Sequence, residues 1–75
     1  MKTKTNEQYL TRFPSNLRIA REEKAMTQAA LATAVNVQQA TIAHYELGDI
    51  KPSAGVLLAL ADALGVPVTR LVEGL

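Results

Sequence analysis

The chain has 75 residues, a length that allows one compact domain with one hydrophobic core. Hydrophobic residues make up 48% of it, which argues against disorder, and only two tyrosines and one phenylalanine are aromatic, so an aliphatic core is expected. The lack of cysteine excludes disulfides and thiolate metal sites. The net charge is only +1, so the overall charge does not by itself indicate a polyanionic partner.

The basic residues are concentrated near the start of the chain. Lys2, Lys4, Arg12, Arg18, Arg21 and Lys24 lie in the first third, and only Lys51 and Arg70 follow. No apolar run approaches the roughly 18–20 residues of a membrane span, and the charged start lacks the apolar core of a signal peptide. We therefore expect a cytoplasmic protein with no membrane association.

Two parts of the chain are expected. Residues 1–12 are predicted to form a flexible N-terminal arm, because the polar start shows no apolar pattern. Residues 13–75 carry helix signals throughout and no strand-like alternation. They are predicted to form one all-α domain of five helices.

Capping residues predict where these helices begin and end. In chain order, the expected helices cover residues 16–25, 28–35, 38–47, 54–64 and 68–75. Ser15, Thr27 and Ser53 are side chains that can cap a helix start. Gly48 and Gly65 stand where a helix commonly ends in the left-handed conformation.

The second and third helices are joined by a very short turn, which makes them cross steeply in helix-turn-helix geometry. Ala32 is small where the next helix must approach closely, and Asn36 tolerates the left-handed conformation that the turn requires. The side chains expected to point inward are Leu31, Ala34 and Val35 from the second helix and Val37, Ile42 and Tyr45 from the third.

The most specific marks of the chain are Thr27-Gln28, Leu31-Ala32, Ile42, Tyr45-Glu46, Gly48, Lys51-Pro52-Ser53 and the run "ALADALGV" in their joint spacing. By these marks, residues 13–75 resemble the phage-repressor (Cro/repressor, XRE-type) family of helix-turn-helix DNA-binding domains. The resemblance implies a compact, five-helix, lambda-repressor-like fold that binds double-stranded DNA.

The outward face of the third helix is the candidate base-reading surface. Gln39 can bond bidentately to the major-groove edge of adenine, and the methyl groups of Ala40 and Ala43 can contact thymine methyls. His44, one turn further on, can donate to guanine N7 or to a phosphate. The alternative is that these are ordinary exposed side chains. The family context favours base contact by Gln39. For His44, base contact and an ordinary exposed side chain are equally expected.

Phosphate contacts are expected at helix N-termini, whose free N–H groups attract anions. The resemblance implies that Gln28 touches the DNA backbone and that the loop containing Lys51 clamps the strand, although a solvated loop lysine is the alternative there. The predicted phosphate contacts are Thr27, Gln28, Gln38, Thr41, Lys51 and Ser53.

Arg21 and Glu46 lie on faces expected to be inward or half-buried, and the resemblance implies an ion pair between them that holds the third helix. The alternative is two separate surface charges. A buried pair of this kind fixes orientation more than it adds stability.

The C-terminus is unusually apolar. Val66, Val68, Leu71, Val72 and Leu75 are expected to form a two-fold dimer contact or, as the alternative, to close the core of the monomer. Ile19 falls opposite the inward face of the first helix. Either Tyr9, Leu10 and Phe13 fold back over it or it belongs to a partner surface.

We therefore expect a sequence-specific transcriptional regulator, a repressor that binds a pseudo-palindromic operator as a homodimer. The alternative is a protein-interaction module, such as an antitoxin that holds a toxin or a factor that bridges regulators, because the charge is near neutral and the reading face is rich in alanine. Enzyme activity, a cofactor and a metal are not expected, since the lone His44 has no cysteine or second histidine beside it in a catalytic or ligand set.

Overall fold

The computed structural model describes residues 10–74. This part of the chain contains α2 (Phe13–Glu23), α3 (Gln28–Val35), α4 (Gln39–Leu47), α5 (Ala54–Leu64) and α6 (Val68–Val72), and it has no strand. The all-α, five-helix fold is confirmed. None of these helices has the length and apolar character needed to span a membrane. Residues 1–9 of the predicted arm, Tyr9 among them, and Leu75 of the predicted dimer contact lie outside the described residues.

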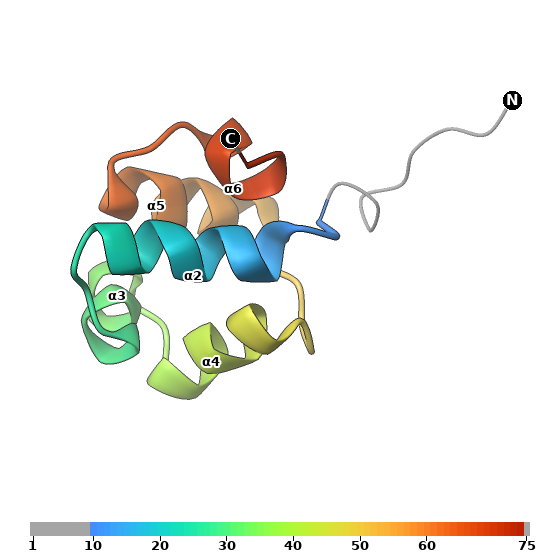
Figure 1. The fold of residues 1–75 in the computed structure, drawn as a ribbon. Helices are drawn as coiled ribbons and strands as arrows, with labels where there is room; N and C mark the ends of the chain where they lie inside the picture. The colour runs from blue at the N-terminus through green and yellow to red at the C-terminus, as the bar shows by residue number, and fades with distance from the viewer. Residues whose placement is uncertain (1–9, 75) are drawn as a thin grey trace, which may run out of the picture.

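Helix α2 runs through the middle of the molecule, with α3 and α4 on one side and α5 and α6 on the other (Figure 1). The short connection between α3 and α4 makes these two helices cross steeply, as the helix-turn-helix prediction requires. Helix α4 packs mainly against α2 and α3, so one of its faces is left at the surface of the domain.

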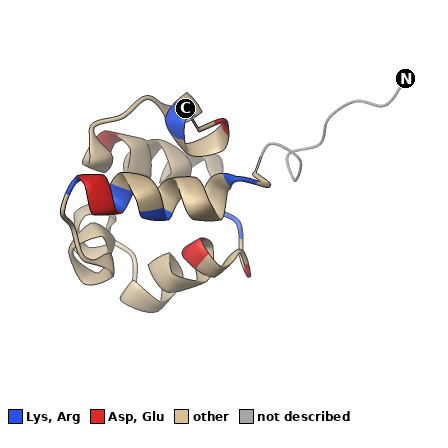
Figure 2. Cartoon of the chain, viewed as in Figure 1, with Lys and Arg blue, Asp and Glu red and all other residues tan. Residues whose placement is uncertain are grey.

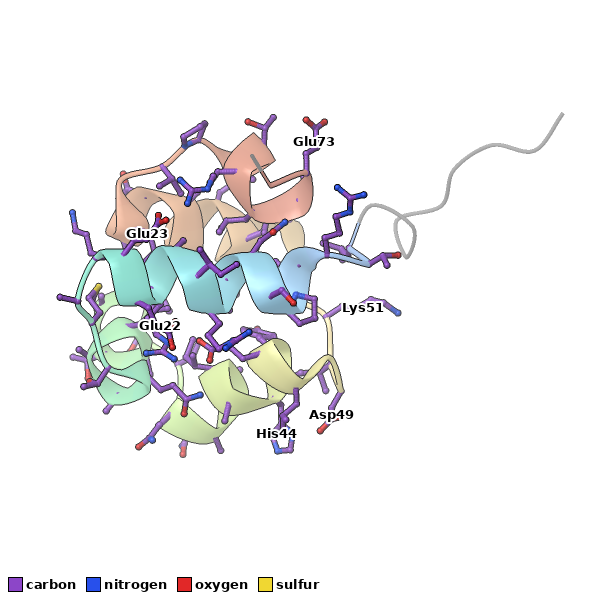
Figure 3. All side chains as sticks on the ribbon, viewed as in Figure 1. Glu22, Glu23, His44, Asp49, Lys51 and Glu73 are labelled. Atoms are coloured by element: carbon purple, nitrogen blue, oxygen red, sulfur yellow. The ribbon has the colours of Figure 1, made fainter. Side chains whose placement is uncertain are left out.

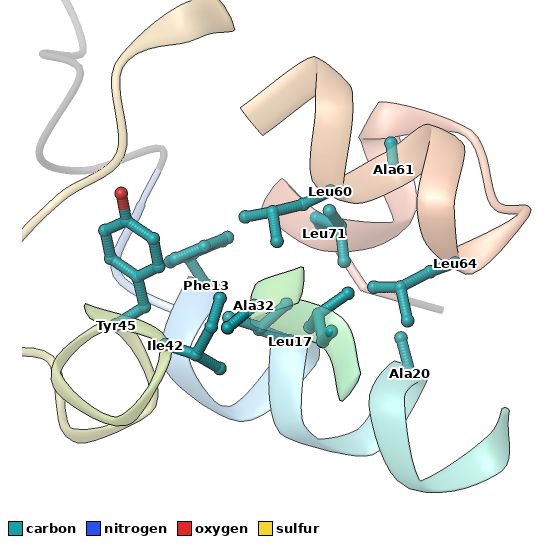
Figure 4. Packing of buried hydrophobic residues seen from close by; sticks show 11 residues of the cluster. Phe13, Leu17, Ala20, Ala32, Ile42, Tyr45, Leu60, Ala61, Leu64 and Leu71 are labelled. Carbon is teal, nitrogen blue, oxygen red and sulfur yellow. The ribbon is translucent and has the colours of Figure 1, made fainter. Parts of the chain in front are cut away.

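The core lies between the five helices, each of which contributes buried side chains (Figure 4). Its buried side chains are Phe13, Leu17, Ala20, Leu31, Ala32, Ile42, Tyr45, Leu60, Ala61, Leu64 and Leu71. The rings of Phe13 and Tyr45 pack edge to face, with centroids 5.9 Å apart and planes at 72°. This contact joins the start of α2 to α4 and helps set the position of the exposed helix.

The helix starts confirm two of the three predicted caps. The hydroxyl of Thr27 accepts a hydrogen bond from the N–H of Ala30 at 3.0 Å, and the hydroxyl of Ser53 accepts one from a backbone N–H at 3.2 Å. The prediction for Ser15 is wrong, because α2 begins at Phe13 and Ser15 lies inside its first turn. Pro14 fits that first turn, where no N–H is needed, and the helix start brings Phe13 into the core.

Helices α2 to α5 all end in the same way. A residue in the left-handed conformation follows each helix, and the next N–H bonds to a carbonyl five residues back, which is a Schellman motif. The left-handed residues are Ala25, Asn36, Gly48 and Gly65, with φ of 58°, 61°, 84° and 69°. The residues that follow them are Met26, Val37, Asp49 and Val66. The three apolar ones are half-buried and pack against the core, whereas Asp49 is exposed.

Two expectations about individual side chains need correction. Ala34 was expected to point inward, but it is exposed, and Ala32 takes the buried place beside Leu31. Phe13 lies in the core instead of covering Ile19, which remains 42% exposed. Leu10, within the predicted arm, packs against the core and accepts a hydrogen bond from the N–H of Phe13 at 3.2 Å.

Leu71 was predicted at a dimer contact, but it is 0% exposed and belongs to the core of the monomer. The reason is the docking of α6 on α2, where the Asn16 side-chain amide donates to the Leu71 carbonyl oxygen at 3.0 Å. For this residue, the alternative of closing the core is the correct one.

Candidate nucleic-acid interface

The exposed helix α4 is held from behind by an ion pair. The Arg21 guanidinium on α2 bonds to both oxygens of Glu46 on α4, with Nε to Oε2 at 2.6 Å and Nη2 to Oε1 at 3.1 Å. Their side chains are only 13% and 6% exposed, so the predicted pair is present and largely buried. The hydrogen bond to Glu46 raises the pKa of Arg21 above its ordinary value, although burial acts against it.

Two further hydrogen bonds extend this pair into a network. Arg21 Nη1 donates to the carbonyl oxygen of Met26 at 2.9 Å, and the Gln28 amide donates to Glu46 Oε1 at 3.1 Å. Side chains from three helices therefore meet at one carboxylate, and Arg21 ties the α2–α3 connection to it. In the described part of the chain, no buried side-chain polar atom lacks a hydrogen-bond partner. A satisfied network of this kind gives α4 one orientation.

The outward face of α4 contains the predicted base-reading residues. Gln39, Ala40 and His44 are exposed and Ala43 is half-buried, while Ile42 and Tyr45 are buried on the opposite face. Burial raises the pKa of the Tyr45 phenol, so this ring is neutral at physiological pH. Helix α4 contains no lysine or arginine, and its red segment in Figure 2 is the inward Glu46. The exposed face thus presents an amide, methyl groups and an imidazole.

The structure adds Asp49 and Ile50 to this region, beside Leu47, which helical spacing already places on the outward face. His44 Nδ1 lies 3.0 Å from Asp49 Oδ2, and both side chains point away from α2 on the outer side of α4 (Figure 3). Leu47 and Ile50 are 72% and 43% exposed at the end of the same helix. Asp49 was not predicted as a site residue. The signal was an acid five residues after a histidine, with a glycine helix end between them.

The predicted phosphate contacts lie at the starts of three helices. Thr27 and Gln28 begin α3, Gln38 precedes α4 without a side-chain cap, and Lys51 and Ser53 stand before α5. The side chain of Lys51 extends away from the helices (Figure 3). The hydroxyls of Thr27 and Ser53 accept hydrogen bonds from backbone N–H groups, so each keeps its own hydrogen to donate. The Gln28 amide keeps a second N–H to donate after its bond to Glu46. Thr41, inside α4, is half-buried.

Two of the other predicted dimer residues, Val68 and Val72, line an open groove. Val66, Val68 and Val72 are half-buried. Val68 and Val72 form one wall of a groove of about 470 Å³, whose other lining residues are Leu10, Lys51, Pro52, Ala54 and Leu57. The groove is mainly apolar and is bounded by α5, α6 and the residues that precede α5.

Comparisons with known proteins agree with this geometry. A helix-turn-helix family model matches residues 17–71, so the chain belongs to the helix-turn-helix family. A crystal structure of the P22 c2 repressor with a synthetic operator is 31% identical, covers 83% of this chain and 94% of that one, and has a TM-score of 0.78. A solution structure of the DNA-binding domain of the P22 c2 repressor is 28% identical, with coverages of 99% and 88% and a TM-score of 0.79. The phage-repressor resemblance is confirmed. No curated protein sequence matches the chain.

Proposed function

We propose that the protein is a transcriptional repressor that binds double-stranded DNA in a sequence-specific manner, with α4 as the recognition helix. The observation that carries the proposal is the position of α4: its inner face is locked by the Arg21–Glu46 network and its outer face is exposed. The similarity to a repressor solved with its operator supports this. An α-helix of this kind fits the major groove, and occupation of a promoter would be sufficient for repression.

In this proposal the outer face of α4 reads bases by hydrogen bonds and methyl contacts. Gln39 bonds to adenine, and Ala40 and Ala43 contact thymine methyl groups. His44 bonds to a base further along the groove, and the exposed Leu47 extends the apolar part of the same surface. With no basic side chain on α4, the affinity comes from phosphate contacts at its edges.

The phosphate contacts frame α4 on two sides. Gln28 and Thr27 at the start of α3 contact one phosphate, and Lys51 and Ser53 at the start of α5 contact another. Gln38 and Thr41 are the corresponding contacts on α4 itself. These groups set the position of the protein without reading sequence.

A second copy of the chain is proposed to pack against the α5–α6 groove. Val68 and Val72 provide the apolar contact, and Leu57 adds to it from α5. Val66, which does not line the groove, is a further proposed contact. A two-fold dimer of this kind would place its recognition helices about one DNA turn, roughly 34 Å, apart. The operator would then be pseudo-palindromic.

Selection of duplexes from a random DNA pool tests the proposal, with Gln39→Ala and Gln38→Ala run in parallel. The wild type is expected to recover an inverted repeat. Gln39→Ala is expected to lose about 1–3 kcal/mol of discrimination at one symmetric position. Gln38→Ala is the matched control, since it removes the neighbouring amide and should weaken binding without changing the selected sequence. Recovery of no sequence above background at low salt would refute the proposal.

The second candidate is a protein-interaction module with a partner such as a toxin. It is favoured by Ile19 and Leu58, which are 42% and 59% exposed on α2 and α5, away from the proposed reading face. This function predicts that no duplex is selected and that substitution of these two residues abolishes partner binding. Both functions hold together if the protein represses the gene of its own partner.

A further inference from the structure

The end of α4 holds His44 and Asp49 together by two hydrogen bonds. The left-handed Gly48 reverses the chain, and the N–H of Asp49 donates to the His44 carbonyl oxygen at 3.0 Å. The same reversal brings the Asp49 carboxylate to 3.0 Å from Nδ1 of the imidazole. The carboxylate is therefore placed beside the ring by the backbone of the turn.

Asp49 is the exception among the four equivalent helix ends. At the other three, the residue after the left-handed position is Met26, Val37 or Val66, and each packs against the core. Such an apolar contact commonly accompanies the Schellman motif. At α4 a hydrogen bond to an exposed histidine stands in place of that contact. Packing does not explain an acid at this position, whereas a role on His44 does.

The hydrogen bond determines where the proton of the imidazole lies. An ionised carboxylate only accepts hydrogen bonds, so Nδ1 must carry the proton that joins it to Asp49. A neutral imidazole has one ring N–H, and the bond made by one nitrogen sets the state of the other. Nε2 is then left with a lone pair. In the described residues, the hydrogen bond to Asp49 is the only one that the ring makes.

We propose that Asp49 is a specificity-determining residue, which fixes His44 in the Nδ1–H tautomer and so makes Nε2 an acceptor toward DNA. This rests on the proposed function, in which His44 faces a base. An acceptor in the major groove selects the amino group of cytosine or adenine. An Nε2–H donor would instead select an acceptor, which guanine N7 or O6, thymine O4 and adenine N7 provide and cytosine does not. This proposal departs from the expectation that His44 donates to guanine N7 or to a phosphate.

The tautomer can be measured without DNA. The chain has one histidine, so a long-range ¹H–¹⁵N spectrum of the tag-free protein reports on His44 alone. At pH 8, where a histidine is ordinarily neutral, the wild type is expected to show a protonated Nδ1 and an unprotonated Nε2. Asp49→Asn should shift the population toward Nε2–H, because an amide can donate or accept and does not dictate the tautomer. Asp62→Asn, an exposed acid on α5, is the charge-matched control and should match the wild type.

The base preference is measured by duplex selection with the same three proteins at the same pH. Opposite His44, the wild type is expected to prefer cytosine, which offers only an amino donor, over guanine and thymine, which offer only acceptors. Asp49→Asn should shift that one position toward guanine or thymine by about tenfold or more, with the Gln39 position unchanged. Asp62→Asn should keep the wild-type preference.

Two results would overturn the inference. One is a wild-type spectrum with the proton on Nε2, and the other is an unchanged base preference in Asp49→Asn. Failure of the proposed function is distinguishable from both, since then no protein selects a duplex at all. In that case the proposed base preference is refuted together with the proposed function, while the ring spectrum still decides whether Asp49 sets the tautomer.

Discussion

The buried Arg21–Glu46 pair supports a quantitative prediction about the position of α4. Arg21→Met keeps an unbranched apolar stem but leaves the 6%-exposed Glu46 carboxylate with Gln28 as its one remaining side-chain donor. Removal of one partner of a buried pair costs about 3–5 kcal/mol, and Glu46→Leu should cost a similar amount. The double variant replaces both charges with apolar groups, so it should lie within about 2 kcal/mol of the wild type. The coupling free energy is then at least about 4 kcal/mol.

Urea unfolding followed by far-UV circular dichroism measures this cycle. A core of this size rarely supplies more than about 3–5 kcal/mol, so all four proteins should be compared at one fixed concentration of a stabilising osmolyte. The reasoning predicts that each single variant is less stable than the double variant. It is refuted if each single substitution costs less than about 1 kcal/mol and the two costs add in the double variant, because the pair would then behave as an exposed one.

Three further predictions concern stability and use the same urea assay. Ala25→Gly should raise the free energy of unfolding by as much as about 1 kcal/mol, because relief of the left-handed alanine (φ 58°) outweighs the chain entropy that glycine loses on folding. A lower free energy of unfolding would contradict this. Ser53→Ala should cost about 1 kcal/mol as a lost cap, while Ser15→Ala inside α2 should change stability by less than about 0.5 kcal/mol; equal losses would contradict the cap assignments. Burial raises the pKa of Tyr45 in the folded protein, so its phenol ionises first in unfolded molecules as the pH rises above about 10. The free energy of unfolding therefore falls in that pH range. Tyr45→Phe should remove that alkaline loss and leave stability near pH 7 within about 0.5 kcal/mol, and an unchanged alkaline profile would contradict the reasoning.

Most of the fold could be predicted because its signals are local. Thr27 and Ser53 cap the helices that follow them, and Asn36 and Gly48 take the left-handed conformation at helix ends. Ser15 was the failure, because a contact distant in sequence overrides its local preference. The start of α2 is set by the burial of Phe13 against Tyr45, which no local pattern around Ser15 reveals.

The candidate site could be predicted in part. Helical periodicity correctly leaves Gln39 and His44 outward, since the inward positions of α4 are apolar. Periodicity could not assign Leu71, because on a helix of 5 residues an apolar side chain suits the core and a partner equally well. It could not find Asp49 either, since its proximity to His44 depends on the chain reversal after Gly48. Side chains that meet through a turn are invisible to a helical pattern.

The central claim is that α4 reads a DNA sequence. The direct test is fluorescence anisotropy at about 0.15 M salt, with the selected duplex and a duplex of equal length and base composition in which the half-sites are scrambled. The account predicts that the selected duplex binds at least about 10³-fold more tightly, in the range of specific DNA-binding proteins. Equal affinity for the two duplexes would contradict it.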